Sequence, residues 1–242
     1  MIAFLLVAWV RTTVGSGCSD PNVTLWWAQR TVPFTMDSAG TPDVPGEAAF
    51  DAIRASFHTW EASCSGLRFQ DNGKAAGLTF AKDGTNAVKW VESGWMHAVG
   101  ALAITTTTYH CSDGSLVDAD IQLDGENFTF SASGAATAAD VQNTVTHEAG
   151  HLLGFAHSTD LESTMYASAN PGETKKRDLT ADDLAGLCTV YPDGGVTPQG
   201  DGGAGTPDAG HGDAGTSTSG SGGCATAAGA PWLALLLLRR RR

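Results

Sequence analysis

The sequence predicts an α+β fold (mixed α/β), in which a twisted mixed β-sheet packs against helices. Three observations predict it: an amphipathic helical segment at residues 47–62, several β-forming segments between residues 67 and 123, and helical patterns that follow them. With both ends of the chain set aside, about 170 residues remain, which suffices for one domain with its own core.

The chain begins with an apolar run from Ile2 to Val10. It is too short to cross a bilayer but has the length of the hydrophobic part of a secretion signal. Small residues at Gly15-Ser16-Gly17 precede Cys18, suit cleavage and weakly resemble a lipoprotein box. We therefore expect residues 1–17 to be a signal peptide and the chain to be exported, with a buried first strand as the alternative.

A long helix is expected from Glu47 to Ala62, because apolar residues recur there at three- and four-residue steps. These residues are Phe50, Ile53, Phe57 and Trp60. β-Forming segments follow at 67–69, 78–81, 87–91, 101–109 and 116–123. They predict the strands of the sheet against which the helix packs.

The next helical segment carries His147-Glu148-Ala149-Gly150-His151 and continues to Gly154 and His157, the pattern HExxHxxGxxH. Residues four apart lie on one face of a helix, so both histidines of the helix can direct a ring nitrogen at one zinc ion. Gly154 can adopt a positive φ and turn the chain back, so that His157 supplies the third ligand. Glu148 is placed to act as general base toward a water in the fourth position.

This extended motif resembles that of the metzincin zinc metallopeptidases, in which a methionine turn follows beneath the metal. Met165 is the candidate here, eight residues after His157, and Ser158 and Tyr166 make the matrixin branch the most similar. The resemblance implies a metzincin-like fold with a small C-terminal subdomain that holds the methionine turn, supported by Gly154, Met165 and Tyr166. Residues 179–192 resemble the closing helix of matrixins, with Thr180 as the expected N-cap and Asp183 at the capping-box position.

In matrixins an edge strand binds the substrate as an additional antiparallel strand, and residues 101–105 are the candidate for this role. The histidines of the second zinc site of vertebrate matrixins are not visible here, nor is a cysteine-bearing propeptide. Four acidic residues offer oxygen ligands for a possible calcium ion, although their spacing matches no standard calcium loop. They are Asp118, Asp120, Asp124 and Glu126.

Residues 193–223 are rich in Gly, Asp, Thr, Ser and Pro, which predicts a flexible, disordered linker. Cys224, an apolar stretch and Arg239 to Arg242 follow, so that residues 224–242 resemble the C-terminal sorting signals of myxobacterial surface proteins. The resemblance implies transient membrane association, a sorting protease acting near Cys224, and display on the bacterial outer surface. A permanent membrane anchor is the alternative.

The formal net charge of −12 argues against nucleic acid as a partner. Four cysteines lie in or just before the predicted domain of residues 18–192, and in an exported chain they suggest two disulfides with three possible connectivities. They are Cys18, Cys64, Cys111 and Cys188.

These observations together predict an exported, cell-surface zinc endopeptidase that cleaves proteins or peptides. His147, His151 and His157 are expected to bind one zinc ion, and Glu148 is expected to be the catalytic base. One alternative is a surface binding or adhesion module on an inactive metzincin scaffold, and another is a zinc hydrolase that cleaves a different bond, such as a deamidase.

Overall fold

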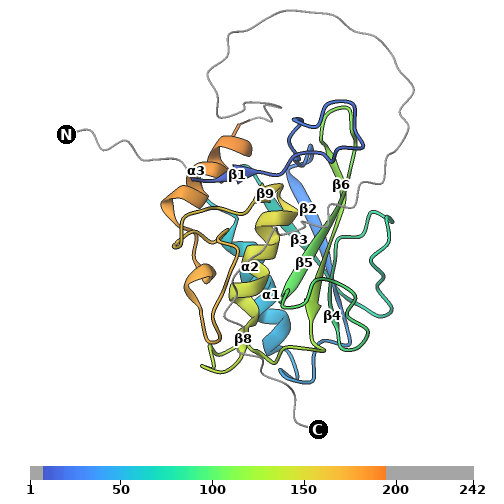
Figure 1. Ribbon diagram of the computed structural model, residues 1–242, viewed down its shortest axis with the longest axis vertical. Coiled ribbons are helices and arrows are strands. Elements are labelled where there is room, and N and C mark those ends of the chain that lie inside the picture. Colours follow the sequence, from blue (N-terminus) through green and yellow to red (C-terminus); the bar gives the residue numbers. More distant parts are fainter. Residues whose placement is uncertain (1–7, 195–242) are drawn as a thin grey trace, which may run out of the picture.

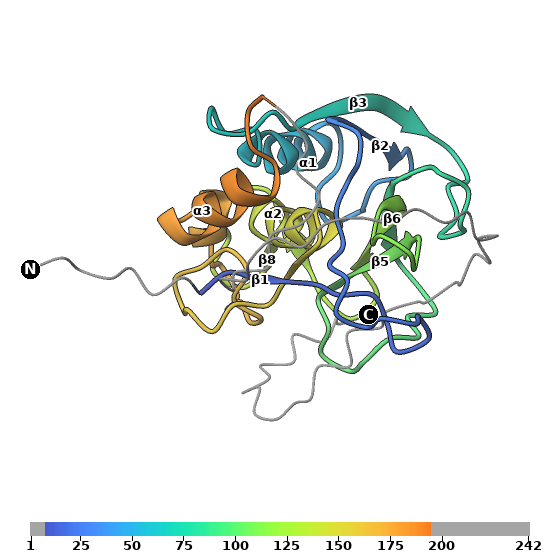
Figure 2. The same ribbon diagram turned by 90° about the horizontal axis from the view of Figure 1, so that it is seen from above.

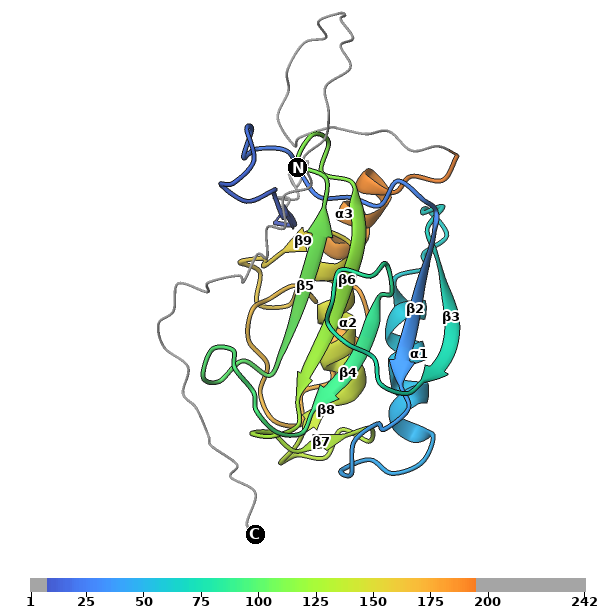
Figure 3. The same ribbon diagram turned by 90° about the vertical axis from the view of Figure 1, so that its right-hand side faces the viewer.

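The computed structural model describes residues 8–194, and their main feature is a five-stranded sheet with two long helices on one face (Figures 1 and 2). The strands lie in the order β3-β2-β4-β6-β5, and β5 alone pairs in the antiparallel sense. Figure 3 shows β5 at one side of the sheet and β3 at the other. The predicted fold class is confirmed. The strands are β2 (Thr31–Asp37), β3 (Arg68–Ala75), β4 (Ala87–Val91), β5 (Ala103–Tyr109) and β6 (Leu116–Asp124).

Helix α1 (Ala48–Thr59) confirms the helix expected over residues 47–62. Its apolar face is buried against the sheet, where the ring of Phe57 stacks on that of Phe34 with centroids 4.0 Å apart. Trp60 follows the last helical turn, is fully buried and donates its indole N–H to the carbonyl of Thr146 at 2.8 Å. The helix is thereby joined to α2 (Val141–Leu152) as well as to the sheet.

Strand β2 lies inside the sheet, in a segment for which the sequence patterns predict no strand. Pro33 argues against a central strand because it has no N–H to donate. In the structure, β4 pairs only with Thr35 and Met36, so Pro33 lies beyond the part of β2 where a neighbour on that side needs its N–H. The Pro33 carbonyl accepts from the Asn86 side chain at 2.7 Å.

The other strand predictions differ in their outcome. Residues 87–91 coincide with β4, and the segments at 101–109 and 116–123 correspond to β5 and β6. The segment at 67–69 is only the start of the longer β3. The strand expected at 78–81 is wrong: these residues belong to the irregular loop before β4, where the Leu78 carbonyl accepts from the Lys89 ammonium at 2.7 Å instead of from a strand N–H.

The end of the N-terminal apolar run forms a short strand, β1 (Val10–Arg11), which pairs antiparallel with β9 (Phe155–Ala156). Thr12 donates its N–H to the Gly154 carbonyl at 2.8 Å, and the ring of Trp9 meets that of Phe155 edge-on. We call residues 8–17 the N-terminal strap. Removal of residues 1–17 as a signal peptide stays a prediction, but the strap is part of the folded domain described here.

Two helix starts are fixed by side-chain caps. At α2, the Asp140 carboxylate accepts from the Asn143 N–H and is also paired with Arg177 of the 3₁₀ turn η1 (Lys175–Arg177), whose Nε lies 2.8 Å away. Asp140 itself lies in β8 (Ala139–Asp140), which pairs with β7 (Phe130–Ser131). At α3 (Ala181–Val190), Thr180 and Asp183 form the capping box that the sequence predicts.

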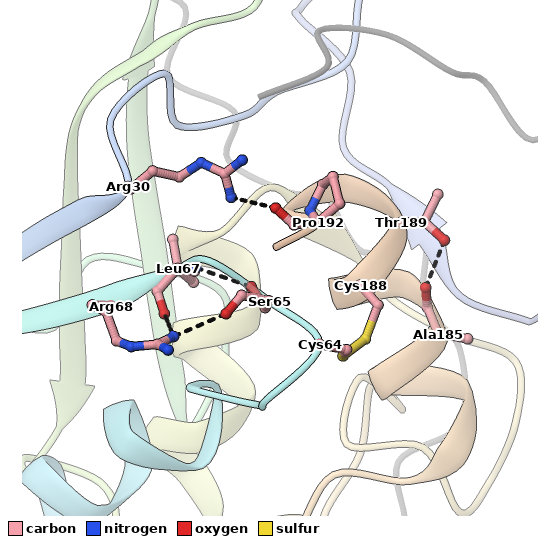
Figure 4. Close-up of a disulfide and its surroundings, with 9 residues drawn as sticks. All are labelled: Arg30, Cys64, Ser65, Leu67, Arg68, Ala185, Cys188, Thr189 and Pro192. Atoms are coloured by element: carbon pink, nitrogen blue, oxygen red, sulfur yellow. Dashed lines mark hydrogen bonds between the residues drawn. A yellow bond between two sulfur atoms is a disulfide. The ribbon is translucent and has the colours of Figure 1, made fainter. Parts of the chain in front are cut away.

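Two disulfides connect distant parts of the chain: Cys18 with Cys111, and Cys64 with Cys188. The second joins the segment after α1 to α3 (Figure 4). Close by, Arg30 donates to the carbonyl of Pro192 at 2.7 Å, so both contacts hold the end of the domain against the start of the sheet. The structure therefore selects one of the three connectivities, and it places the sulfur of Cys18 in a disulfide rather than free for a lipid.

The predicted linker from residue 195 onward and the sorting segment of residues 224–242 lie outside the described residues. Among residues 8–194, the helices are all too short or too polar to cross a membrane.

Candidate metal centre

Helix α2 supplies two of the three predicted ligands. His147 and His151 lie one turn apart and their rings meet edge-on, with centroids 4.7 Å apart. The shared helix backbone places both side chains on the same face, where their rings can approach one ion.

The third imidazole arrives because the chain reverses after α2. Gly154 has a φ of +87°, a conformation that residues with a Cβ rarely adopt. Short strand β9 then leads to His157, whose ring stacks on that of His147 with centroids 5.2 Å apart. The helix and the turn thus bring all three rings to one place.

The three Nε2 atoms converge. His151 Nε2 lies 3.2 Å from that of His147 and 3.1 Å from that of His157, and the remaining pair is 3.3 Å apart. Nitrogens bound to one tetrahedral zinc ion at its usual bond length would be about 3.3 Å from one another. The observed separations fit such an ion.

The other ring nitrogens decide which tautomer is present. His147 Nδ1 lies 2.7 Å from the Thr164 carbonyl, and His151 Nδ1 lies 2.7 Å from the Phe155 carbonyl. A carbonyl oxygen can only accept, so both Nδ1 atoms must carry the proton. The Nε2 lone pairs of these neutral rings are therefore available to a cation, as is usual for histidine ligands.

The charge state of the rings also suits a metal. Burial lowers the pKa of His147 well below its ordinary value, and burial lowers the pKa of His151 and of His157 to about 4. Near neutral pH all three rings are uncharged, which is the form that binds a metal ion.

Glu148 follows the first histidine and is 5 % exposed. Burial raises the pKa of its carboxyl to about 7. The Thr105 hydroxyl on β5 donates to Glu148 Oε2 at 2.7 Å. The nearby ammonium of Lys176 opposes the effect of burial. A carboxyl group that titrates near neutrality beside a metal centre is suited to exchange protons with a reacting water.

Met165 packs against α2 at Gly150, the residue before His151, and is 2 % exposed. Its sulfur occupies the space next to Gly150, where a Cβ would come within 2.2 Å of it. The turn that carries Met165 is held to α3, because Asp183 accepts from the Ser163 hydroxyl and from the Thr164 N–H. Helix α3 thus holds the turn in place, and the Thr164 carbonyl of this turn orients the ring of His147.

Tyr166 directly follows this turn and is half-buried. Its carbonyl accepts from the ammonium of Lys176, and its backbone pairs with Ser158, the residue after the third histidine. Lys176 is 2 % exposed, and burial lowers its pKa to about 8. The chain after the metal centre is therefore anchored at both Met165 and Tyr166.

The histidines His58 and His97 do not join this centre. His58 is exposed beside Glu61, and His97 Nε2 lies 3.0 Å from Gln122 Oε1. In the described part of the chain, one group of three or more His, Cys, Asp or Glu residues has ligand atoms that converge, and this group is His147, His151 and His157. The four acidic residues considered for calcium form no such group, so the geometry does not support a calcium site among them.

Several contributors to the site were not predicted from the sequence: Thr105, Thr164, Phe155, Asp183 and Lys176. Thr164 and Phe155 act through main-chain carbonyls, which any residue type provides, so no sequence signal exists for them. Thr105 lies in a run of four threonines whose alternation across the sheet hides which one faces the helix.

The sheet and its two packed helices carry a three-histidine centre with an adjacent buried carboxyl. This arrangement defines a metallopeptidase domain of the zinc-binding class. More narrowly, the chain belongs to the matrixin family, whose family model matches residues 26–192. This confirms the resemblance to matrixins drawn from the motif, and the family implies that the metal is zinc.

Curated relatives support this assignment over shorter stretches. Metalloendoproteinase 1-MMP of Arabidopsis thaliana is 50% identical over 54 residues, which is 22% of this chain and 15% of that protein. Metalloendoproteinase 1 of Glycine max is 41% identical over 66 residues, or 27% and 20% of the two chains. Metalloendoproteinase 5-MMP of Arabidopsis thaliana is 32% identical over 95 residues, or 36% and 25%. The matched region thus spans a quarter or less of each relative.

Proposed function

We propose that this chain is a zinc-dependent endopeptidase. The observation that carries the proposal is the convergence of three neutral imidazoles, with Nε2 atoms 3.1 to 3.3 Å apart, next to the buried carboxyl of Glu148. Three protein ligands leave one position of a tetrahedral ion for solvent or substrate, which distinguishes a catalytic zinc site from a structural one.

Each residue of the centre has a defined task. His147, His151 and His157 hold the ion through Nε2, and the carbonyls of Thr164 and Phe155 keep two of these rings in the required tautomer. Zinc, when bound, supplies Lewis-acid chemistry that polarises a carbonyl group and acidifies water. The Glu148 carboxylate takes a proton from the attacking water and delivers it to the amine nitrogen of the breaking peptide bond.

The substrate is proposed to bind along residues 101–105, which lead into the first part of β5. This strand forms an outer edge of the sheet (Figure 3) and contacts α2, which carries Glu148. An edge strand presents unpaired N–H and carbonyl groups, and an extended peptide can pair with them as an additional strand. Residues 101–105, proposed from the sequence for this role, include the first part of β5. A protein or peptide in extended conformation is thus the substrate class that this arrangement supports.

The test of this function is the substitution Glu148→Gln in the full-length chain. The amide keeps the shape of the side chain and leaves the three ligands untouched, so zinc content should equal that of the wild type. Hydrolysis of dye-labelled casein should fall to background, because the amide cannot accept the proton. The wild-type activity should also disappear with a chelator and return with zinc.

Two outcomes would contradict the proposal. A Glu148→Gln chain that digests casein at the wild-type rate would refute the role of the carboxyl. A wild-type chain that holds one zinc ion yet cleaves neither casein nor a peptide library would instead indicate a binding module on this scaffold. Product masses from the library would reveal hydrolysis of another bond, such as a side-chain amide.

We further propose that the protein is exported and displayed on a bacterial surface, with its tail processed near Cys224 by a sorting protease. Two disulfides in the domain and the apolar run at residues 2–10 support export, and the order of Cys224, apolar stretch and arginine cluster supports processing. The intact mass of the protein recovered from the cell surface should show loss of the arginine tail and oxidised cysteines. A full-length, reduced chain in the cytoplasmic fraction would contradict this.

A further inference from the structure

We propose that Thr105 is a positioning residue that holds the carboxylate of Glu148 in the orientation needed to accept a proton. The inference rests on the proposed endopeptidase function and adds to it a residue that lies outside the zinc-binding motif. It starts from a contact between the edge strand and the helix that carries the motif.

The contact is short and partly enclosed. Thr105 Oγ1 lies 2.7 Å from Glu148 Oε2 and 3.1 Å from the main-chain oxygen of the same residue. Glu148 is buried and Thr105 is half-buried. Within residues 8–194, the hydrogen bond that the structure shows to the Glu148 carboxylate comes from the Thr105 hydroxyl. A donor to an ionised group in a buried position is worth more than one between neutral groups.

The backbone of β5 keeps the hydroxyl in place. Residues 103–108 pair with β6 in unbroken antiparallel register, and Thr105 lies opposite Ile121. Its side chain is β-branched, which restricts rotation about χ1. Glu148, by contrast, has a long flexible side chain whose end would otherwise sample several orientations. The rigid partner therefore orients the flexible one.

Among the four consecutive threonines of β5, Thr105 is the one whose hydroxyl the structure places on the Glu148 carboxylate. Side chains alternate across a strand, so Thr105 and Thr107 point toward the helices while Thr106 and Thr108 point away. The Thr106 hydroxyl lies 3.5 Å from the Gln122 side chain on the opposite face. Thr108 is on that face too and therefore offers a matched control, because its side chain is remote from Glu148.

The chemical consequence concerns the proton acceptor. A carboxylate has two oxygens and several lone pairs, so a bond from Thr105 to Oε2 leaves capacity to accept from a water. Because Thr105 belongs to the strand proposed to bind the substrate, one strand would set both the register of the peptide and the direction of the base. Thr105 would thus link the pairing of the substrate with β5 to proton transfer by Glu148.

The experiment compares Thr105→Val, Thr105→Ser and Thr108→Val with the wild type, all as full-length zinc-loaded chains. Valine removes the hydroxyl and keeps the branched shape, whereas serine keeps the hydroxyl. Zinc content and melting temperature are measured for each chain. kcat and KM are measured with an internally quenched peptide selected from the cleavage profile of the wild type.

We expect Thr105→Val to lower kcat by roughly ten- to a hundredfold, the range for loss of a hydrogen bond to a charged group. KM, zinc content and melting temperature should stay close to wild-type values, since the peptide and the metal do not depend on this hydroxyl. Thr105→Ser should recover most of the kcat, and Thr108→Val should match the wild type.

A Thr105→Val chain with wild-type kcat would overturn this inference and leave the proposed function intact. Loss of zinc or of stability in Thr105→Val, without rescue by serine, would assign the residue a merely structural role and also overturn it. A wild-type chain that holds zinc and cleaves no peptide would overturn the proposed function and this inference together.

Discussion

At the scale of single residues, two glycines set the geometry around the three histidines. A Cβ at Gly154 would lie 2.4 Å from the Leu25 carbonyl, and its φ of +87° is unfavourable for other residues. A Cβ at Gly150 would collide with Met165. The sequence motif predicts the need for Gly154 through the turn it makes. The need for Gly150 comes from a residue fifteen positions away, and only the fold brings the two together.

Two buried carboxyls on β6 make the stability of the domain depend on pH. Asp120 is 2 % exposed, and burial raises its pKa to about 7; burial, together with the charge of Asp83, raises that of Asp118 to about 6. An unfolded chain would release these protons near pH 4. Between about pH 4 and 7 the folded state therefore binds more protons than the unfolded state, so its stability should fall as pH rises through that interval.

The substitution Asp120→Asn tests this dependence. Asparagine keeps an oxygen for the N–H of Ala87, which lies 2.9 Å from Asp120 Oδ1, and carries no charge to bury. We expect Asp120→Asn to melt at a higher temperature than the wild type at pH 8 and at a similar temperature at pH 4. The measurement is thermal unfolding across this range.

The matched control is Glu162→Gln, since the Glu162 side chain is 77% exposed and its neutralisation should change little at any pH. If Asp120→Asn melts below the wild type at pH 8, the charge of Asp120 is stabilised by the fold and the argument from burial is wrong.

At the scale of elements, the N-terminal strap supports the turn that carries the third histidine. β1 pairs with β9, Val14 is 2 % exposed, and Trp9 lies against Phe155. The strap continues into Cys18, which is joined by a disulfide to Cys111 in the turn that follows β5. β9 is only two residues long and reaches His157 immediately, so its partner strand helps to determine where that ring points.

Removal of the strap should therefore weaken both folding and metal binding. We compare two chains that end at Gly194 and begin at Ala8 or at Cys18, the boundary predicted from the sequence. The shorter chain should lose roughly 3 kcal/mol of unfolding free energy, from the buried side chains of the strap, and should bind zinc more weakly. Denaturant unfolding and zinc titration measure both effects.

Trp9→Ala in the longer chain separates side-chain packing from strand pairing and should give an intermediate loss. Equal stability and equal zinc affinity of the chains that begin at Ala8 and Cys18 would show that the strap is dispensable and that the sequence-based boundary is adequate.

At the scale of the whole molecule, the order of strands places the metal centre against an edge of the sheet. Strand β6 follows β5 in the sequence, but in the sheet it lies between β4 and β5. Strand β5 is therefore left at the edge of the sheet. The edge strand then contacts α2, which follows β6 in the sequence. The metal ligands, the base and the proposed substrate strand thus come from one continuous stretch of residues 103–157.

The sequence alone determined the parts of this protein that depend on local spacing. Helical periodicity fixed α1, the spacing of His147, His151 and Gly154 fixed a metal-binding helix and its turn, and Thr180 with Asp183 fixed the start of α3. Each of these signals is contained within about four turns of chain, where backbone geometry dictates which side chains are neighbours.

Tertiary structure alone decided the rest, because contacts between distant segments leave no periodic trace in a single sequence. It placed β2 inside the sheet despite Pro33, and it paired Cys18 with Cys111 and Cys64 with Cys188. It also brought the Thr105 hydroxyl to Glu148 across 43 positions of chain. The motif thus specifies the ligands, whereas packing of strand, helix and strap specifies how firmly the ligands and the base are held.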